Sequence, residues 1–318
     1  MAKTPESETT RLDDAARAGW LYYVADNSQD EIARKLGVSR QVAQRLVSLA
    51  VSERLVRVWL DHPIAACMDL AARLVEKYDL VYSEVVPSDP TSTSQVLGTA
   101  EAAGRYLERV LRAEQPIILA LGTGRSLRAA VNQLPSMDCP QHKVISLIGN
   151  VAPDGSASFY DVITKIADKT NAPHFPMSVP VFPASREEQQ MILKLKTVQQ
   201  VYALAAKADV CMVGVGTIGD DAPIFLDGFI ERHEIRAMIN AGAVGEITGR
   251  AFNINGQFIK GLISDRVVSA PMPQNNGVPI IGVAMGVAKV KAIRGGLLGR
   301  LINGLITDEA TAKALLQA

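Results

Sequence analysis

The chain has 318 residues, 48% of them hydrophobic and 21% charged, which is the composition of a globular protein with about two domains of ~150 residues each. Lysine plus arginine and aspartate plus glutamate both number 33, so the chain lacks the overall positive charge of many nucleic-acid-binding proteins, although a local basic face remains open. Its first residues are polar and no apolar run reaches ~18 residues, so we expect neither a secretory signal nor a membrane span. We therefore expect a cytoplasmic protein.

The N-terminal segment predicts two helices in succession. Small and apolar residues recur at helical spacing over residues 12–25 and indicate a first helix. Ser28, followed three residues later by Glu31, forms a capping box that begins a second helix at about Gln29. Gly37 ends this helix, because glycine adopts the left-handed conformation that a tight helix terminus requires.

A third helix follows at once. Ser39 is a second N-cap residue and begins a helix that we expect to continue to about Ser52. Val42, Leu46 and Leu49 have the spacing of a buried stripe on this helix. Two short helices joined by a glycine turn predict a helix-turn-helix, and residues 55–60 favour a short strand that forms part of a wing.

The start of the third helix has the residues that base readout requires. Arginine pairs with guanine and glutamine with adenine when a recognition helix enters the major groove. Residues 27–60 include six basic and three acidic side chains, so this segment is locally basic, as phosphate contacts need. The alternative is a small helical subdomain with a solvated polar face. The predicted DNA-binding residues are Ser39, Arg40, Gln41, Gln44 and Arg45.

The remaining residues alternate between strand-like and helix-like segments. This alternation predicts an α/β fold with a mainly parallel sheet that is covered on both faces. Asn255-Gly256 favours a hairpin or turn on that sheet. The expected strands are residues 80–86, 116–121, 143–148, 178–182, 209–215 and 279–285, and the expected helices include residues 94–113, 185–195 and 197–208.

Glycines cluster where three of these strands end. In open α/β sheets, ligands bind at the carboxyl ends of strands near a topological switch point, and glycine lets the backbone approach a ligand closely. Three such loops in one domain favour a ligand site over simple tight turns. The first loop also begins a helix, whose free N–H groups suit an anion. The loops contain Gly122, Thr123, Gly124, Arg125 and Ser126, then Gly149 and Asn150, then Gly214, Gly216, Thr217 and Gly219.

These loops do not match the common nucleotide motifs. No Gly-Lys-Ser/Thr follows the glycines, and no GxGxxG precedes an acidic residue placed for a ribose, so neither nucleotide hydrolysis nor NAD is supported, and we expect no cofactor. Cysteines and histidines are isolated, which argues against a metal site and predicts that Cys67, Cys139 and Cys211 are buried free thiols. Two further residues are candidates, namely Glu246 to accept sugar hydroxyls and Lys289 to meet an anion.

Four segments together resemble the SorC family of bacterial transcriptional regulators. They are SQDEIARKLGVSRQVAQRL, LGTGRSL, GAVGEITGRAF and the C-terminal GVAKVKAIRGGLLGRLINGLITDEATAKALL, and the resemblance extends from about Trp20 to Leu316. The first segment is shared by many helix-turn-helix proteins, whereas the last is more specific.

The resemblance implies a DNA-binding domain over residues 1–60 and an effector-binding and oligomerisation domain over residues 61–318, similar in fold to sugar-phosphate isomerases and deaminases. It further implies a homotetramer that binds operator DNA and responds to a sugar, a polyol or a sugar phosphate. The effector positions that it implies are Gly122, Thr123, Gly124, Arg125, Gly216, Glu246 and Lys289.

The chain departs from the family pattern at two places. Glu53-Arg54 stands where relatives usually have a glycine between the recognition helix and the wing. The loop GNVAPDGSAS after Ile148 has no arginine, which favours a free sugar, a polyol or a monophosphate over a doubly phosphorylated sugar.

A sugar-phosphate isomerase or deaminase with an accessory N-terminal domain is the alternative function. Such an enzyme needs a general base within reach of the substrate. The deaminase relatives carry Asp-Gly-His in the glycine loop after a central strand, whereas the corresponding GVGTIGDDAP here has no histidine. The sequence therefore predicts a sensor and not an enzyme.

Overall fold

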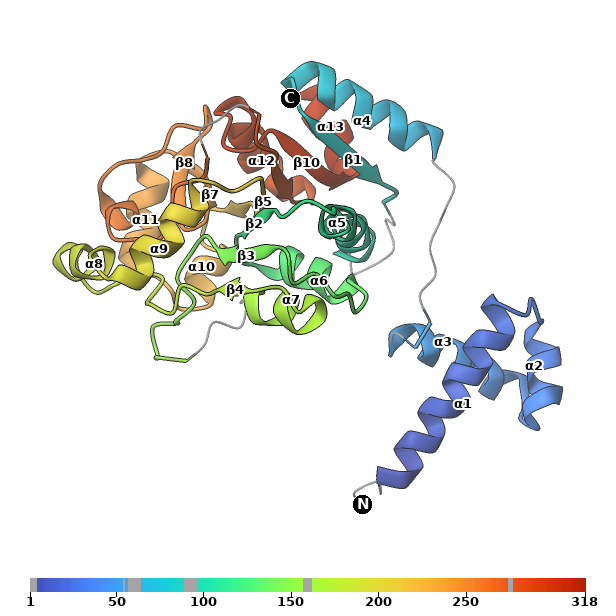
Figure 1. Ribbon diagram of the computed structural model, residues 1–318. Coiled ribbons are helices and arrows are strands. Elements are labelled where there is room, and N and C mark those ends of the chain that lie inside the picture. The colour runs from blue at the N-terminus through green and yellow to red at the C-terminus, as the bar shows by residue number, and fades with distance from the viewer. Residues whose placement is uncertain (1–4, 54, 57–63, 89–95, 157–161, 274–276) are drawn as a thin grey trace. The chain divides into compact units, whose positions relative to one another are not determined.

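The computed structural model describes residues 5–53, 55–56, 64–88, 96–156, 162–273 and 277–318 (Figure 1). The chain divides into two compact units, residues 1–63 and 64–318. The sequence-based boundary lies between residues 60 and 61.

The first unit contains three helices, α1 (Pro5–Tyr23), α2 (Gln29–Leu36) and α3 (Arg40–Ser52). The predicted capping box is confirmed, because the Glu31 N–H donates to the Ser28 hydroxyl while the Glu31 carboxylate accepts from the Ser28 N–H. Gly37 ends α2 with φ at 68°, and the Ser39 hydroxyl caps α3 by accepting from the Val42 N–H. These are the parts of a helix-turn-helix.

The buried stripe of α3 differs from the predicted one. Val42 is exposed and Leu49 is only partly buried, so of the three predicted residues only Leu46 belongs to the core. The helix turns small residues toward α1, where Gly19 lies so close to Ala50 that a Cβ on the glycine would clash. The core of the unit is formed by Ala15, Ala18, Ile32, Ala33, Ala43, Leu46, Val47 and Ala50. The wing strand expected at residues 55–60 falls mostly outside the described residues, and Leu55 and Val56 form a bend.

The second unit is built on a parallel seven-stranded sheet, as the sequence predicts. Its spatial order is β1 (Tyr82–Val86), β10 (Gly304–Asp308), β9 (Ile280–Val283), β5 (Val210–Gly214), β2 (Ile118–Leu121), β3 (Lys143–Ser146) and β4 (His174–Phe175).

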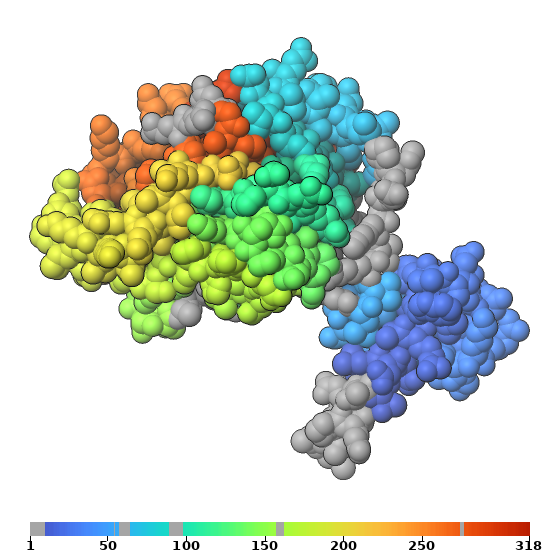
Figure 2. All heavy atoms as spheres, in the orientation of Figure 1, coloured from blue at the N-terminus to red at the C-terminus, as the bar shows by residue number. Residues whose placement is uncertain are grey.

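Helices cover both faces of this sheet, because side chains alternate along each strand. Leu119 and Leu121 of β2 pack under one layer, while Ala120 packs under the other. The first layer is α5 (Val96–Leu111), α6 (Arg125–Gln133) and α7 (Ile163–Thr170). The second is α4 (Ala65–Tyr78), α9 (Lys196–Ala205), α12 (Val290–Leu298) and α13 (Glu309–Gln317). Figure 2 shows α9 and the neighbouring α8 (Arg186–Leu193) in yellow at the surface of this unit.

One predicted strand is wrong, and one predicted turn belongs to a different sheet. Residues 178–182 form no strand; Pro180 lacks an N–H for a ladder, and only an isolated bridge joins it to Val151. The predicted turn at Asn255-Gly256 is present, because Gly256 has φ 73°, its N–H donates to the Asn253 carbonyl oxygen, and an antiparallel bridge joins Phe252 to Phe258. This turn does not lie on the main sheet but follows the last strand of a separate sheet of β6 (Gly216–Thr217), β7 (Ala243–Ile247) and β8 (Arg250–Asn253). In that sheet, β7 and β8 form a hairpin that turns at Thr248-Gly249, both with positive φ.

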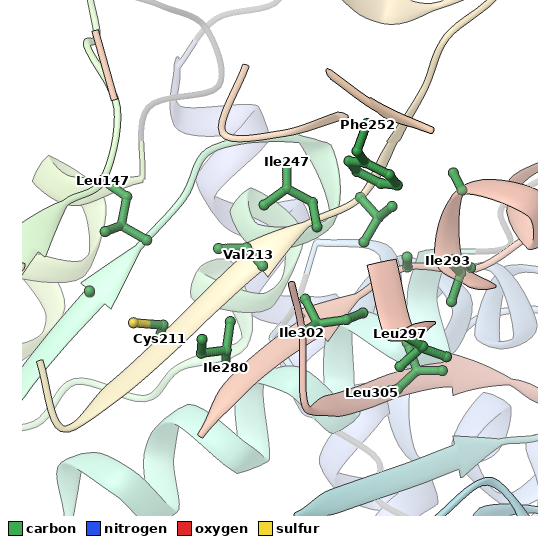
Figure 3. Close-up of a cluster of buried hydrophobic side chains, with 14 of the residues drawn as sticks. Leu147, Cys211, Val213, Ile247, Phe252, Ile280, Ile293, Leu297, Ile302 and Leu305 are labelled. Carbon is green, nitrogen blue, oxygen red and sulfur yellow. The ribbon is translucent and has the colours of Figure 1, made fainter. Parts of the chain in front are cut away.

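The small sheet is anchored to the main sheet by buried apolar side chains. Figure 3 shows Ile247 and Phe252 of the hairpin in one cluster with Val213 of β5 and with Ile293 and Leu297 of α12. The carboxyl end of β5 continues into β6, so the hairpin stands beside the loop that follows β5. The remaining short helices are α10 (Pro223–Leu226), α11 (Arg232–Asn240) and the 3-10 turns Leu262–Asp265 and Val287–Lys289.

Candidate functional site

The order of the main sheet reverses between β5 and β2. The chain proceeds from β2 outward to β3 and β4 on one side, while β9, β10 and β1 lie on the other side of β5. The glycine loops after β2 and β5 therefore flank a topological switch point, where ligands bind in sheets of this type. Gly124 is the N-cap of α6 and has φ 129° and ψ 168°, which only glycine adopts readily.

A cavity of about 230 Å³ lies at this switch point. One part of its wall is polar and comes from the loops and the hairpin, with Gly122, Thr123, Gly124, Arg125, Ser126, Gly214, Gly216, Asp227, Glu246, Thr248, Gly249 and Lys289. The other part is apolar, with Ile148, Val181, Phe182, Val215, Pro223, Ile224 and Phe229. A mixed wall of this kind holds a small organic ligand with a few fixed polar contacts.

Glu246 is fixed at the cavity wall by the hairpin turn. It pairs with Gly216 across β7 and β6, and its carboxylate accepts a hydrogen bond of 2.8 Å from the Gly249 N–H. Burial raises the pKa of Glu246, whereas the Gly249 hydrogen bond and the positive charge of Lys289 act in the opposite direction. The protein thus holds a carboxylate where desolvation disfavours its charge, which is typical of functional sites.

Lys289 approaches the same carboxylate from the start of α12. Its Nζ donates a 3.0 Å hydrogen bond to the carbonyl oxygen of Val215. Burial lowers the pKa of Lys289, while Glu246 raises it and the charge of Arg125 lowers it. The ammonium group is therefore placed between the loop after β5 and the hairpin.

Arg125 occupies the first position of α6 and forms an ion pair with Asp227, with 3.6 Å between the guanidinium and carboxylate atoms. Arg125 is largely exposed and Asp227 is about one quarter exposed. Asp227 could not be predicted from the sequence, because Arg125 lies far away along the chain and only the folded loop brings the two together.

Gly149, Asn150 and Thr217 are predicted effector residues that do not line the cavity. The predicted effector residues that do line it are Gly122, Thr123, Gly124, Arg125, Ser126, Gly216, Glu246 and Lys289. Gly149 and Asn150 turn away from it, because their N–H groups donate to Val268 and Met177 and because a Cβ on Gly149 would meet the backbone of Val179. Thr217 also lies outside the cavity wall, on β6 opposite Gly245. Four parts of the wall were not predicted from the sequence, namely Asp227, Thr248, Gly249 and the apolar side chains. Of these, the Thr248-Gly249 turn has a recognisable sequence signal, which is a glycine after a polar residue.

The predicted base-reading side chains are all exposed at the start of α3. Arg40 forms an ion pair of 3.6 Å with Asp30 of α2, and both side chains are about two-thirds exposed. Such a pair contributes little to stability, so Arg40 can exchange this partner for a phosphate or a base.

Over the described part of the chain, no group of three or more His, Cys, Asp and Glu side chains is placed to bind a metal, and no helix combines the length and hydropathy needed to cross a bilayer. The three cysteines are free and buried, as predicted, and burial raises the pKa of Cys211 to about 12.

A cavity at the switch point of an α/β unit, together with a separate helix-turn-helix unit, defines a ligand-binding transcriptional regulator. Residues 62–317 match the family described as "Putative sugar-binding domain". The chain belongs to the SorC family of sugar-binding transcriptional regulators.

Named relatives match the chain over nearly its full length. The erythritol catabolism regulatory protein EryD of Brucella abortus is 34% identical over 302 residues, which cover 95% of this chain and 96% of EryD. The transcriptional regulator LsrR of Klebsiella pneumoniae is 29% identical, with 95% and 92% covered. The crystal structure of the full-length sorbitol operon regulator SorC from Klebsiella pneumoniae has a TM-score of 0.71 and 25% identity, and the match covers 96% of this chain and 99% of that chain.

Proposed function

We propose that the chain binds operator DNA through residues 1–63 and is controlled by a small sugar, polyol or sugar phosphate held in the cavity of residues 64–318. The single observation that carries this proposal is the cavity at the switch point, where Glu246, Lys289 and the glycine loop that begins α6 line the same wall. Backbone N–H groups and two charged side chains in a partly apolar cavity suit a molecule with several hydroxyl groups.

The DNA contacts follow from the exposed start of α3. Arg40, Gln41, Gln44 and Arg45 would enter the major groove, and Ser39 would fix the helix start. A regulator that reads DNA in this way acts in the cytoplasm of a bacterium. Its two half-sites require at least a dimer, and the family resemblance implies a tetramer.

The cavity acts as a sensor and not as a catalyst in this proposal. The relatives that match over their full length are named as regulators. One observation favours the alternative enzyme, because a carboxyl group with a raised pKa, such as Glu246, can serve as a general base. Incubating the purified protein with the compound that it binds and recording the NMR spectrum of that compound separates the two functions, since a sensor returns it unchanged.

A thermal-shift screen is the direct test of the proposed function. EryD is named for erythritol and SorC for sorbitol, so the screen begins with these two compounds and extends to other polyols, sugars and their phosphates. A ligand at 100 times its dissociation constant should stabilise the folded protein by ~2.7 kcal/mol. The same compound should change the affinity for operator DNA in a gel-shift titration. The proposal fails if no compound does both.

A further inference from the structure

The charges around the cavity cancel in pairs. Its wall includes two cations, Arg125 and Lys289, and two carboxylates, Asp227 and Glu246. Arg125 forms its ion pair with Asp227, and the charges of Lys289 and Glu246 attract one another. Each cation that a phosphate would use therefore has a carboxylate near it on the cavity wall.

We propose that the effector is an uncharged polyhydroxylated compound, a polyol or a free sugar, and that the cavity rejects the phosphate ester of the same carbon skeleton. This inference rests on the proposed function in one respect, namely that the cavity is the effector site. It goes further by naming the class of ligand. A phosphate group would bring up to two negative charges beside two carboxylates.

The loop after β3 adds no positive charge. Gly149 and Asn150 turn away from the cavity, and none of the described residues of this loop contributes a lysine or arginine to the wall. The N-terminus of α6 does favour an anion, but its partial charge of about half a unit is smaller than the full charge of either carboxylate. The balance around the cavity is therefore unfavourable for a phosphate.

The same groups are well suited to hydroxyls. The Glu246 carboxylate accepts hydrogen bonds from hydroxyl protons. Lys289 has three N–H bonds, of which one donates to the Val215 carbonyl, and a hydroxyl oxygen accepts from another. The carbon skeleton of a polyol packs against the apolar wall, which includes Phe182 and Phe229. Because a hydroxyl both donates and accepts, it is compatible with the carboxylate and the ammonium group together.

The test compares matched pairs of ligands by titration calorimetry on the full-length protein. The pairs are erythritol and erythritol 4-phosphate, ribitol and ribitol 5-phosphate, and D-glucitol and D-glucitol 6-phosphate, with the corresponding aldoses and inorganic phosphate added. The compound that binds should be uncharged, its phosphate ester should bind about tenfold more weakly or worse, and its affinity should change less than about twofold between 50 and 500 mM NaCl.

Two results would overturn the inference, and they differ in what they mean for the proposed function. If a phosphate ester binds more tightly than its parent compound, the charge argument is wrong but the chain remains a sugar-responsive regulator. If no member of the panel binds, the cavity is not an effector site and both proposals fail.

A charge-removing variant tests the physical cause. Asp227→Asn removes the partner of Arg125, so the preference for the uncharged compound over its phosphate ester should fall by about tenfold. Asp220→Asn removes the same charge from an exposed residue in the same region that lies outside the cavity wall, and it should leave this preference unchanged. An unchanged preference in Asp227→Asn, or an equal change in both variants, contradicts the inference.

Discussion

Glu246 and Gly216 are cross-strand partners, and the carboxylate of the first lies against the Cα of the second. A Cβ at position 216 would occupy the space of the Glu246 carboxylate, so the glycine is what allows this side chain to fold back over β6. The loop after β5 and the hairpin thus hold one another in place at the cavity wall. The position of the Glu246 carboxylate depends on the absence of a side chain at position 216.

The first prediction concerns this pair. Gly216→Ala should displace the Glu246 carboxylate from the cavity wall and weaken effector binding by about tenfold or more. Gly219→Ala is the matched control, because a Cβ there meets only the flexible end of Asp221 and lies outside the cavity wall. Calorimetric titration with the effector checks both variants. Equal affinities in Gly216→Ala and Gly219→Ala would show that the position of the carboxylate is unimportant.

The second prediction concerns pH. Burial raises the pKa of Glu246 above its usual value of 4.5, so the folded chain binds this proton more tightly than the unfolded chain does. The free energy of unfolding should therefore fall as the pH rises from 4.5 through the raised pKa, and Glu246→Gln should remove this fall because the amide carries no charge. The ligand-free variant should melt at a higher temperature than the parent at about pH 8, with a smaller difference at about pH 5.

Glu114→Gln is the control for this experiment, since Glu114 is exposed in the same unit. Its melting temperature should follow that of the parent at both pH values. A Glu246→Gln protein whose melting temperature differs from the parent by the same amount at both pH values would mean that Glu246 does not titrate in this range.

The third prediction concerns Gly124. The backbone conformation there is one that glycine alone adopts readily, so Gly124→Val should lower the free energy of unfolding by roughly 1–3 kcal/mol. No atom lies within 4 Å of a Cβ built at this position, and Gly124 lines the cavity, so the added side chain occupies ligand space. The variant should still bind operator DNA but should no longer respond to the effector, because a ligand shifts an equilibrium only through differential affinity.

Gly155→Val separates strain from blockage. Gly155 also has a positive φ of 82° and open space around its Cβ position, but it lies outside the cavity wall. It should cost stability and keep the response in a gel-shift titration with and without effector. A Gly124→Val protein that responds like Gly155→Val would place the effector elsewhere.

Local features of the fold could be predicted because their signals lie within a few residues. The capping box at Ser28 and the glycine terminus at Gly37 are of this kind, and both are confirmed. The alternating segments predicted the parallel sheet, but β10 and the two-residue strand β4 were not predicted. The observed buried face of α3 is shifted by about one residue from the predicted face. Helical periodicity predicts that a stripe is buried, but packing against α1 decides which residues at its border are buried.

The candidate site divides in the same way. The glycine loops that follow strands predicted a ligand site at the switch point. Gly122 to Ser126 and Gly216 of these loops line the cavity there. The loop after β3 looked equivalent but packs against the segment before α8, which no local signal indicates. The ion pair of Arg125 and Asp227 depends on the fold of a loop distant in sequence, so no local signal indicates that a carboxylate lies beside Arg125.

The fourth prediction concerns assembly. One helix-turn-helix contacts one half-site, and two-fold dimers reach half-sites about one helical turn or a multiple of it apart. We therefore expect a homo-oligomer, a dimer or tetramer, by light scattering at micromolar concentration, and protection of two or more half-sites in a footprint. A monomer with and without operator DNA would contradict this prediction.

The fifth prediction concerns the recognition helix. Arg40 and Arg45 are exposed at the start of α3, and Arg40 forms a weak surface pair with Asp30. Replacing either arginine with Ala should cost ~1–3 kcal/mol of operator binding and relax specificity at one base pair if the residue reads a base, whereas a phosphate contact would weaken binding evenly and reduce the salt slope by ~1. Gel-shift titrations at several salt concentrations, against the operator and single-base variants of it, distinguish these roles.

Ser48→Ala, an exposed change on the later part of α3, is the control and should keep the parent's affinity. Asp30→Ala should leave affinity equal or higher, because it frees Arg40 and removes a negative charge near the phosphates. If Arg40→Ala and Arg45→Ala both bind the operator as the parent does, α3 is not the helix that reads the DNA.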